Sequence, residues 1–248
     1  MPPAGVDAAS GGAERYSGRV TGRSTMPGDM IDTALLAGVE LFRDLSPDDL
    51  EQLAQRATTR ALQRNDVLFY EGDDADALYV VEDGRIAIAN RSPDGRESVV
   101  ALMERGDLLG EMGLFERRGR SAEARALETS TVAEVPFDVV REMLEGRPEL
   151  LWGVVELLAR RIRNTDEALA DSVFLDVTGR TAKRLLELAS GADEFQLPIT
   201  QEELAGMVGA SRERVNKAIA SFIRLGWLDQ RDRRYRIVNR EQLERRAR

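Results

Sequence analysis

Residues 108–122 read LLGEMGLFERRGRSA, and this stretch decides how the rest of the chain is interpreted. It combines a glycine followed by an acid, Gly110-Glu111, with a basic residue followed by a hydroxyl, Arg120-Ser121. Backbone N–H groups at a glycine and at the start of a helical turn bind phosphate oxygens. Arginine adds a charged fork, and serine adds a hydroxyl donor. The stretch therefore predicts a small anion site that carries one carboxylate.

Glu111 narrows the class of ligand. A carboxylate beside a phosphate is repulsive unless it faces a hydroxyl donor, as when an acidic residue holds a ribose 2′-OH next to a phosphate-binding turn. A ribose together with a phosphate indicates a nucleotide. Taken alone, the same letters also fit a surface loop with a scattered Arg and Glu, because short motifs arise by chance.

The composition excludes several classes of protein. The chain of 248 residues contains neither cysteine nor histidine. Disulfides, zinc sites, thiol nucleophiles, serine–histidine triads and the usual haem ligands therefore cannot be built. We predict no metal, no catalytic residues and no enzyme activity. No stretch approaches the roughly 20 apolar residues of a membrane helix, and the N-terminus lacks a signal pattern, so we expect a cytoplasmic location without a membrane partner.

The charge of the chain is unevenly distributed. The formal net charge is −9, but residues 177–248 hold 15 Lys and Arg against 10 Asp and Glu, which leaves −14 for the rest. A basic C-terminal part on an acidic body is the electrostatic pattern expected of a DNA-binding protein. Without a supporting motif, the same difference would be ordinary surface variation.

Short runs of alternating apolar and polar residues fill residues 61–136, with turn signals at 72–74, 82–84 and 92–95. This spacing predicts short strands in an antiparallel sandwich or roll. Gly72 and Gly84 are expected at positive φ in tight turns. The predicted strands are Val67–Tyr70, Ala77–Val81, Ile86–Ala89, Ser98–Leu102, Ala122–Leu127 and Thr131–Val135.

The run GEMGLF at 110–115, followed by RSA at 120–122, resembles the phosphate-binding cassette of cyclic-nucleotide-binding domains. Among these it is most similar to the CRP/FNR family of bacterial transcription regulators, in the cAMP receptor protein branch. The resemblance implies that Glu111 holds the ribose 2′-OH and that Arg120 and Ser121 hold the cyclic phosphate, with Gly110 and Met112 in the same cassette. The missing cysteines and histidines exclude the iron–sulfur and haem-sensing members.

Helical patterns flank the predicted sheet. Ser46-Pro47 caps a helix from Pro47 to about Thr58, whose apolar stripe should pack on the sheet. A second apolar stripe, near the heptad spacing, predicts a helix that pairs with a second copy as a parallel coiled coil. The alternative is that this helix lies on its own β-roll. The stripe consists of Leu151, Val155, Leu158, Ile162, Thr165, Leu169 and Val173.

Thr165 is the polar break in this stripe, and a hydroxyl in a dimer seam costs stability relative to Val or Leu. Residues 159–165 resemble the dimer helix of the CRP/FNR family, which implies that Thr165 contacts the adenine ring. The next position there is usually Ser or Asn and contacts the base from the opposite subunit, but this chain has Asp166. A carboxylate accepts from an adenine amino group or from the guanine N–H donors. The sequence therefore leaves open whether the base of the ligand is adenine, as in cAMP, or guanine.

Residues 200–225 carry the pattern of a helix-turn-helix. A capping box begins at Thr200-Gln201, Gly209 marks the break, and Ser211 caps a second helix. The sequence from Ile199 to Ile219 resembles the DNA-binding unit of the same family, which implies a GTGA-type half-site. Inward-facing packing residues should be Ala205, Val208, Val215, Ala218 and Ile219. The predicted DNA-binding residues are Thr200, Gln201, Ser211, Arg212, Glu213, Asn216 and Lys217.

Together these patterns predict an α+β protein. We expect a disordered tail at 1–29, a cyclic-nucleotide-binding β-roll (jelly roll) at 30–147, a dimerisation helix at 148–176 and a winged helix-turn-helix at 177–248. The hypothesis is a homodimeric regulator, switched by cAMP, that binds double-stranded DNA. RNA polymerase is a further implied partner, although the loop near 190–196 that would touch it is short.

Two alternatives stay open. One keeps DNA binding but replaces cAMP by cGMP or cyclic di-GMP, or removes the need for a ligand. The other is a cyclic-nucleotide module that acts on a protein partner.

Overall fold

Two antiparallel four-stranded sheets face each other in the N-terminal half of the chain. The structure, a computed structural model, describes residues 31–91, 97–116, 118–232 and 234–248. The tail expected at 1–29 and the turn expected at 92–95 lie outside the described residues. The first sheet has the order β1 (Thr58–Leu62), β8 (Ser130–Pro136), β3 (Ala77–Asp83), β6 (Leu108–Leu109). The second has the order β2 (Val67–Phe69), β7 (Glu123–Ala126), β4 (Ile86–Arg91), β5 (Glu97–Met103).

The central strand β3 is buried on both faces. Ala77, Tyr79 and Val81 point into the space between the two sheets, where they meet Ile86 and Ala124. Leu78 and Val80 point the other way, into a cluster formed with the surrounding helices. Successive side chains of a strand alternate between faces, so a strand with an apolar run packs on both sides. The predicted roll is confirmed.

The first sheet is covered on its outer face by short helices. They are α1 (Thr33–Gly38), η1 (Glu40–Phe42), α2 (Pro47–Arg56), α4 (Phe137–Gly146) and η2 (Pro148–Leu150). As predicted, α2 begins at Pro47: Ser46 and Asp49 form a reciprocal capping box, and Leu50 and Leu53 are buried in the cluster with Leu78 and Val80. The helix ends at Arg56, two residues before the predicted end.

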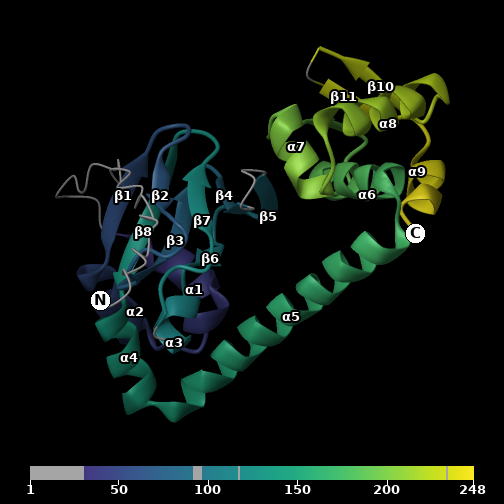
Figure 1. Ribbon diagram of the computed structural model, residues 1–248. Coiled ribbons are helices and arrows are strands. Elements are labelled where there is room, and N and C mark those ends of the chain that lie inside the picture. Colours follow the sequence, from purple (N-terminus) through teal and green to yellow (C-terminus); the bar gives the residue numbers. More distant parts are fainter. Residues whose placement is uncertain (1–30, 92–96, 117, 233) are drawn as a thin grey trace, which may run out of the picture.

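The long helix α5 (Leu151–Phe174) leads away from the β-roll (Figure 1). Its first turns pack on the β-roll part through Gly153, Val154 and Leu157, which are buried. A Cβ on Gly153 would lie 2.9 Å from the carbonyl oxygen of Glu40, so the close approach requires glycine. The predicted seam lies on a different face. All six apolar seam positions are more than a third exposed in the chain: Leu151, Val155, Leu158, Ile162, Leu169 and Val173.

Beyond α5, another apolar cluster forms around α6 (Val177–Ala189), α7 (Gln201–Val208) and α8 (Arg212–Arg224), and it also takes in residues of the second sheet. A three-stranded sheet of order β10 (Leu228–Arg231), β11 (Arg234–Ile237), β9 (Glu194–Gln196) and the helix α9 (Arg240–Arg246) complete it. The helix α6 begins at Val177, because the Asp176 carboxylate accepts a hydrogen bond from Gly179 N at 2.8 Å and caps it. The predicted winged helix-turn-helix is confirmed.

Candidate functional site

The stretch 108–122 forms a cradle at one edge of the β-roll. Strand β6 ends at Leu109, the chain turns at Gly110, and α3 (Met112–Glu116) follows. Gly110 has φ of +81°, and a Cβ there would lie 2.6 Å from Nη1 of Arg120 and 3.4 Å from the Tyr79 ring. Only glycine combines this conformation with this close approach. The cradle therefore needs Gly110 so that Arg120 can pass beneath the turn.

Arg120 is the buried cation of the cradle, with an exposed fraction of 4%. Its Nη1 donates to the Gly110 carbonyl at 3.0 Å, and its guanidinium carbon lies 4.3 Å from the Phe69 ring centroid and 5.3 Å from that of Tyr79. Burial lowers the pKa of Arg120. Its Nε has no hydrogen-bond partner among the described residues. A buried guanidinium with a spare donor, held between aromatic rings, is suited to bind an anion.

Ser121 and Met112 lie at the open side of the cradle. Both are exposed, and the Ser121 hydroxyl lies 3.4 Å from the Met112 sulfur, with which it forms a weak hydrogen bond. The segment before Ser121 is fixed to the loop between β2 and β3, since Arg120 N donates to Asp73 O and Gly72 N donates to Arg120 O, each at 2.8 Å. The serine hydroxyl is thus presented to solvent next to a fixed arginine.

Glu111 is completely buried, and it forms an ion pair with a residue that the sequence patterns did not select. Its Oε1 lies 2.9 Å from Nη1 of Arg161 on α5, while Nη2 of Arg161 donates to the Leu108 carbonyl at 2.9 Å. Neither carboxylate oxygen has a partner in hydrogen-bond geometry among the described residues. Burial raises the pKa of Glu111, and the charges of Arg161 and Arg120 oppose that rise. Both carboxylate oxygens therefore retain the capacity to accept hydrogen bonds from a hydroxyl.

Arg161 also relates the cradle to Thr165. Thr165 lies four residues further along α5, so it shares a helix face with Arg161, and its hydroxyl donates to the Arg161 carbonyl at 2.9 Å. Thr165 and Asp166 are both exposed. The structure brings together Gly110, Glu111, Met112, Arg120 and Ser121. It places Thr165 one helical turn beyond Arg161 on α5. No described contact links Asp166 of the same chain to the cradle.

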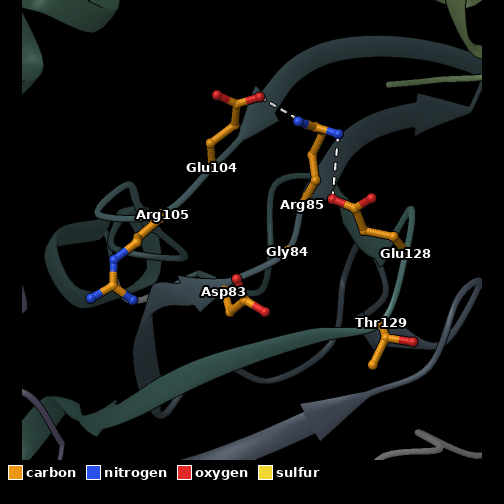
Figure 2. A pocket seen from close by; sticks show the side chains of 7 residues that line it. All are labelled: Asp83, Gly84, Arg85, Glu104, Arg105, Glu128 and Thr129. Carbon is orange, nitrogen blue, oxygen red and sulfur yellow. Dashed lines mark hydrogen bonds and ion pairs between the residues drawn. The ribbon is translucent and has the colours of Figure 1, made fainter. Parts of the chain in front are cut away.

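A second hollow lies beside the turn between β3 and β4 (Figure 2). Its central cation, Arg85, is already paired with Glu104 at 2.8 Å and with Glu128 at 3.4 Å. These ion pairs leave the hollow without a free charge at its centre, and it is not a candidate site. Among the described residues no cluster of acids has the composition of a metal site. Nor does any helix in the described ranges have the length and apolarity to cross a membrane.

The helix-turn-helix is built from two capped helices. Thr200 and Glu203 form a capping box at the start of α7, Gly209 ends it at φ of +66°, and the Ser211 side chain caps α8. A glycine at this position reverses the chain at no steric cost. The five predicted packing residues are all buried: Ala205, Val208, Val215, Ala218 and Ile219.

The predicted DNA-binding residues divide into two groups. All five positions at the start of α8 are exposed and point away from the core: Ser211, Arg212, Glu213, Asn216 and Lys217. Thr200 and Gln201, at the start of α7, are half-buried. Gln201 Nε2 donates to the Tyr235 hydroxyl at 2.8 Å, which fastens α7 to β11 of the wing. The exposed start of α8 matches a recognition helix, which presents its N-terminal residues to base edges.

Comparison with known proteins identifies both domains. A family model described as "Cyclic nucleotide-binding domain" matches residues 59–147, and one described as "Crp-like helix-turn-helix domain" matches residues 179–246. The "CRP-like cAMP-activated global transcriptional regulator" of Mycobacterium tuberculosis is 36% identical over 221 residues, which cover 86% of this chain and 99% of that relative.

Solved structures show the same fold. FixK2 from Bradyrhizobium japonicum superposes with a TM-score of 0.70 at 20% identity, over 76% of this chain and 96% of that one. The "c-di-GMP Responsive Global Regulator CLP" of Xanthomonas campestris superposes with a TM-score of 0.68 at 26% identity, over 77% of this chain and 99% of that one. The chain belongs to the CRP/FNR family of transcription regulators, with a cyclic nucleotide-binding domain and a helix-turn-helix domain.

Proposed function

We propose that the chain is a homodimeric transcription regulator whose affinity for DNA is set by a cyclic nucleotide in the cradle. The observation that carries this proposal is the buried Glu111 next to the buried Arg120. A carboxylate with free acceptor positions suits the ribose 2′-OH, and a guanidinium with a free donor suits the cyclic phosphate. Gly110, Met112 and Ser121 complete the ligand-binding set.

The dimer would form through α5, within the dimerisation segment 148–176. Beyond its first turns, the helix carries Leu169 at 61%, Val173 at 66% and Phe174 at 82% exposed. Full burial of such a side chain stabilises by about 1.5–3 kcal/mol. A second copy of the same helix would cover the stripe. It would also bring its own residue 166 to the mouth of the cradle, beside Thr165. We assign Asp166 to the site of the opposite subunit.

The DNA-binding surface is the start of α8. In a dimer, two such helices would read a near-palindromic site of GTGA type in successive major grooves, about 34 Å apart. Arg212 and Lys217 suit guanine, Glu213 suits the cytosine amino group, and Ser211 suits a phosphate oxygen. Thr200 and Gln201 lie at the start of α7, where a helix N-terminus would meet the DNA backbone. Such a regulator would act in the cytoplasm, with RNA polymerase as a further partner.

We take cAMP as the first choice of ligand. The relative in Mycobacterium tuberculosis is named as cAMP-activated, whereas the one in Xanthomonas campestris is named as responsive to c-di-GMP. Asp166 is the residue that makes this choice worth testing, because a carboxylate also suits the N–H donors of guanine.

A gel-shift titration with GTGA-type palindromes tests the proposal. The full chain is titrated without ligand and with cAMP, cGMP or cyclic di-GMP. We expect cAMP to tighten binding, and a response to cyclic di-GMP alone would replace cAMP as the ligand. Absence of DNA binding under every condition would overturn the DNA-binding role and favour a cyclic-nucleotide module that acts on a protein partner.

A further inference from the structure

The outer face of the second sheet contacts the helix-turn-helix domain of the same chain. Ala89 of β4 and Val99 of β5 belong to one buried apolar cluster with Leu204 and Val208 of α7. Gly206 of α7 approaches so closely that a Cβ on it would lie 3.3 Å from Val99 N and 3.4 Å from Glu97 O. The two domains are therefore packed together at β5 and α7, in addition to being joined by α5 (Figure 1).

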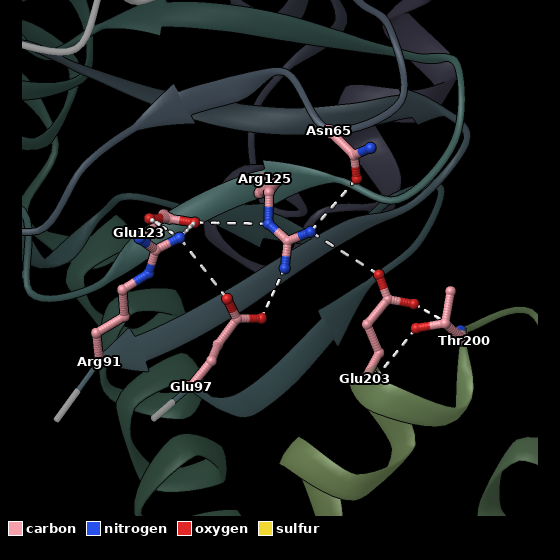
Figure 3. A network of polar contacts seen from close by, with 7 residues as sticks. All are labelled: Asn65, Arg91, Glu97, Glu123, Arg125, Thr200 and Glu203. Carbon is pink, nitrogen blue, oxygen red and sulfur yellow. Dashed lines mark hydrogen bonds and ion pairs between the residues drawn. The ribbon is translucent and has the colours of Figure 1, made fainter. Parts of the chain in front are cut away.

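A polar network links the second sheet to the start of α7 (Figure 3). Arg125 of β7 lies 2.6 Å from a Glu97 oxygen, 3.5 Å from Glu123 and 3.9 Å from Glu203 of α7. Glu203 serves two purposes, since its other oxygen accepts from Thr200 N at 2.6 Å and caps α7. The side chains of Arg125 and Glu203 are only 15% and 8% exposed. An ion pair shielded from solvent to this degree is screened far less than a surface pair.

Strand β7 connects this network directly to the cradle. The strand starts at Glu123, two residues after Ser121, and Arg125 follows two residues later. Four residues of extended chain span at most about 14 Å, so the Ser121 and Arg125 backbones lie no further apart than that. β7 is hydrogen-bonded to β2 on one side and to β4 on the other. The proposed phosphate-binding residues are thus joined to Arg125 by a short stretch of backbone that ends in a strand paired on both edges.

We propose that β7, with the Arg125–Glu203 ion pair and the Val99–Gly206 contact, couples the cradle to the helix-turn-helix domain within one subunit. This route is separate from the dimer helix, and it rests on the function proposed above. The element with two states is the contact between β5 and α7, which is closed in the structure and opens when the domains part. A nucleotide acts on it only through different affinities for the closed and open arrangements.

The contact can be measured without DNA or nucleotide. The chain contains no cysteine, so Val99→Cys introduces a single thiol at the contact, at a position that is 5% exposed. Its rate of reaction with a thiol reagent reports how often the contact opens. Val154→Cys gives a matched control thiol, because Val154 is 6% exposed and packs in the other apolar cluster, between α5 and the β-roll.

Three changes open the contact by different means. Arg125→Gln removes the positive charge of the ion pair. Glu203→Gln removes its negative charge but keeps a side-chain acceptor for the cap. Gly206→Ala improves the helix propensity of α7 while its methyl group pushes against β5. Arg85→Gln is the matched control, because Arg85 pairs with Glu104 and Glu128, both within the β-roll part.

In the Val99→Cys background, we expect each of the three changes to accelerate labelling about fivefold, the size of a moderate pairwise coupling. Arg85→Gln should leave the rate unchanged, as should all changes for the thiol at residue 154. Equal labelling rates at residue 99 in all variants would overturn the proposed contact. Faster labelling at both thiols would show general unfolding and would overturn it as well.

The coupling itself is read from the ratio of DNA affinities with and without cAMP or cyclic di-GMP. We expect this ratio to fall about fivefold in Arg125→Gln and Glu203→Gln, and to stay at the wild-type value in Arg85→Gln. A wild-type ratio in variants that label faster would overturn the coupling and leave the proposed function intact. A wild-type chain whose DNA affinity ignores both nucleotides would remove the proposed function and the coupling together.

Discussion

Arg161 and Glu111 are 50 residues apart in the sequence, and their side chains meet with Nη1 2.9 Å from Oε1. The pair joins α5 to the cradle at the carboxylate that we assign to the ribose. Arg161 also donates to the Leu108 carbonyl, so one side chain fastens the helix to both sides of the Gly110 turn. Under the proposed function, a ligand that shares Glu111 with Arg161 would act on the orientation of α5, which carries the exposed apolar stripe.

The first prediction concerns this pair. Arg161→Gln leaves the buried Glu111 carboxylate without its cation, and we expect a loss of about 1–3 kcal/mol in the free energy of unfolding together with weaker nucleotide binding. Glu111→Gln should remove most of that penalty when it is combined with Arg161→Gln. Chemical denaturation of the two single variants and the double variant gives the coupling energy. Additive losses in the double variant would contradict a direct interaction.

The second prediction concerns pH. Burial raises the pKa of Glu111 in the folded chain, so the folded state holds this proton more tightly than the unfolded state does. The free energy of unfolding should therefore fall as the pH rises from the ordinary glutamate value through the raised pKa. The measurement is the difference between wild type and Glu111→Gln across this window, since the difference cancels the other acids. If this difference in the free energy of unfolding did not change with pH, the prediction of a raised pKa for Glu111 would be contradicted.

The third prediction concerns the stripe on α5. Leu169→Glu places a charge in the apolar seam of the proposed helix pair, where burial of an unpaired carboxylate is costly. We expect sedimentation equilibrium to show a dimer for wild type and a monomer for this variant. Glu167→Gln, which lies outside the stripe, is the control and should remain a dimer. A monomeric wild-type chain would refute the proposed assembly.

The fourth prediction concerns the start of α8. Lys217→Ala should lower the preference for one base pair of the site by about 1–3 kcal/mol, while binding to the other positions is retained. Arg236→Ala, on the wing strand β11, should instead weaken all sequences alike and reduce the dependence on salt. Binding-site selection at two salt concentrations separates the two effects. Identical losses on every sequence for Lys217→Ala would place this residue on the DNA backbone instead.

Local sequence patterns predicted most of the fold. The capping pairs at Ser46 and Thr200, the positive φ of Gly72 and Gly84 and the alternation of the β-roll strands depend on neighbouring residues only. The short strands β1, β6 and β9 were not predicted. β6 and β9 have only two and three residues, too few for a periodicity to be recognised. In β1 the apolar residues are Ala61 and Leu62, and Leu62 alone is buried.

Long-range contacts were beyond the sequence patterns. Arg161 looked like one of several solvent-facing basic residues on a helix, and only the folded chain shows that it reaches Glu111. One signal existed, because Arg161 precedes Thr165 by one helical turn and so shares its face. The packing of α7 on β5 had no such signal, since Gly206 and Val99 are ordinary residues of two separate patterns.

The most direct measurement is a calorimetric titration of cAMP into the wild-type chain and into Arg120→Leu, with cyclic di-GMP titrated in parallel. Leucine removes the buried guanidinium but keeps an apolar side chain between Phe69 and Tyr79, so the dimer should persist. We predict one site per chain for cAMP in the wild type and no heat of binding in Arg120→Leu. Equal binding in both proteins, or no heat from either nucleotide with the wild type, would contradict a cyclic-nucleotide site in this cradle.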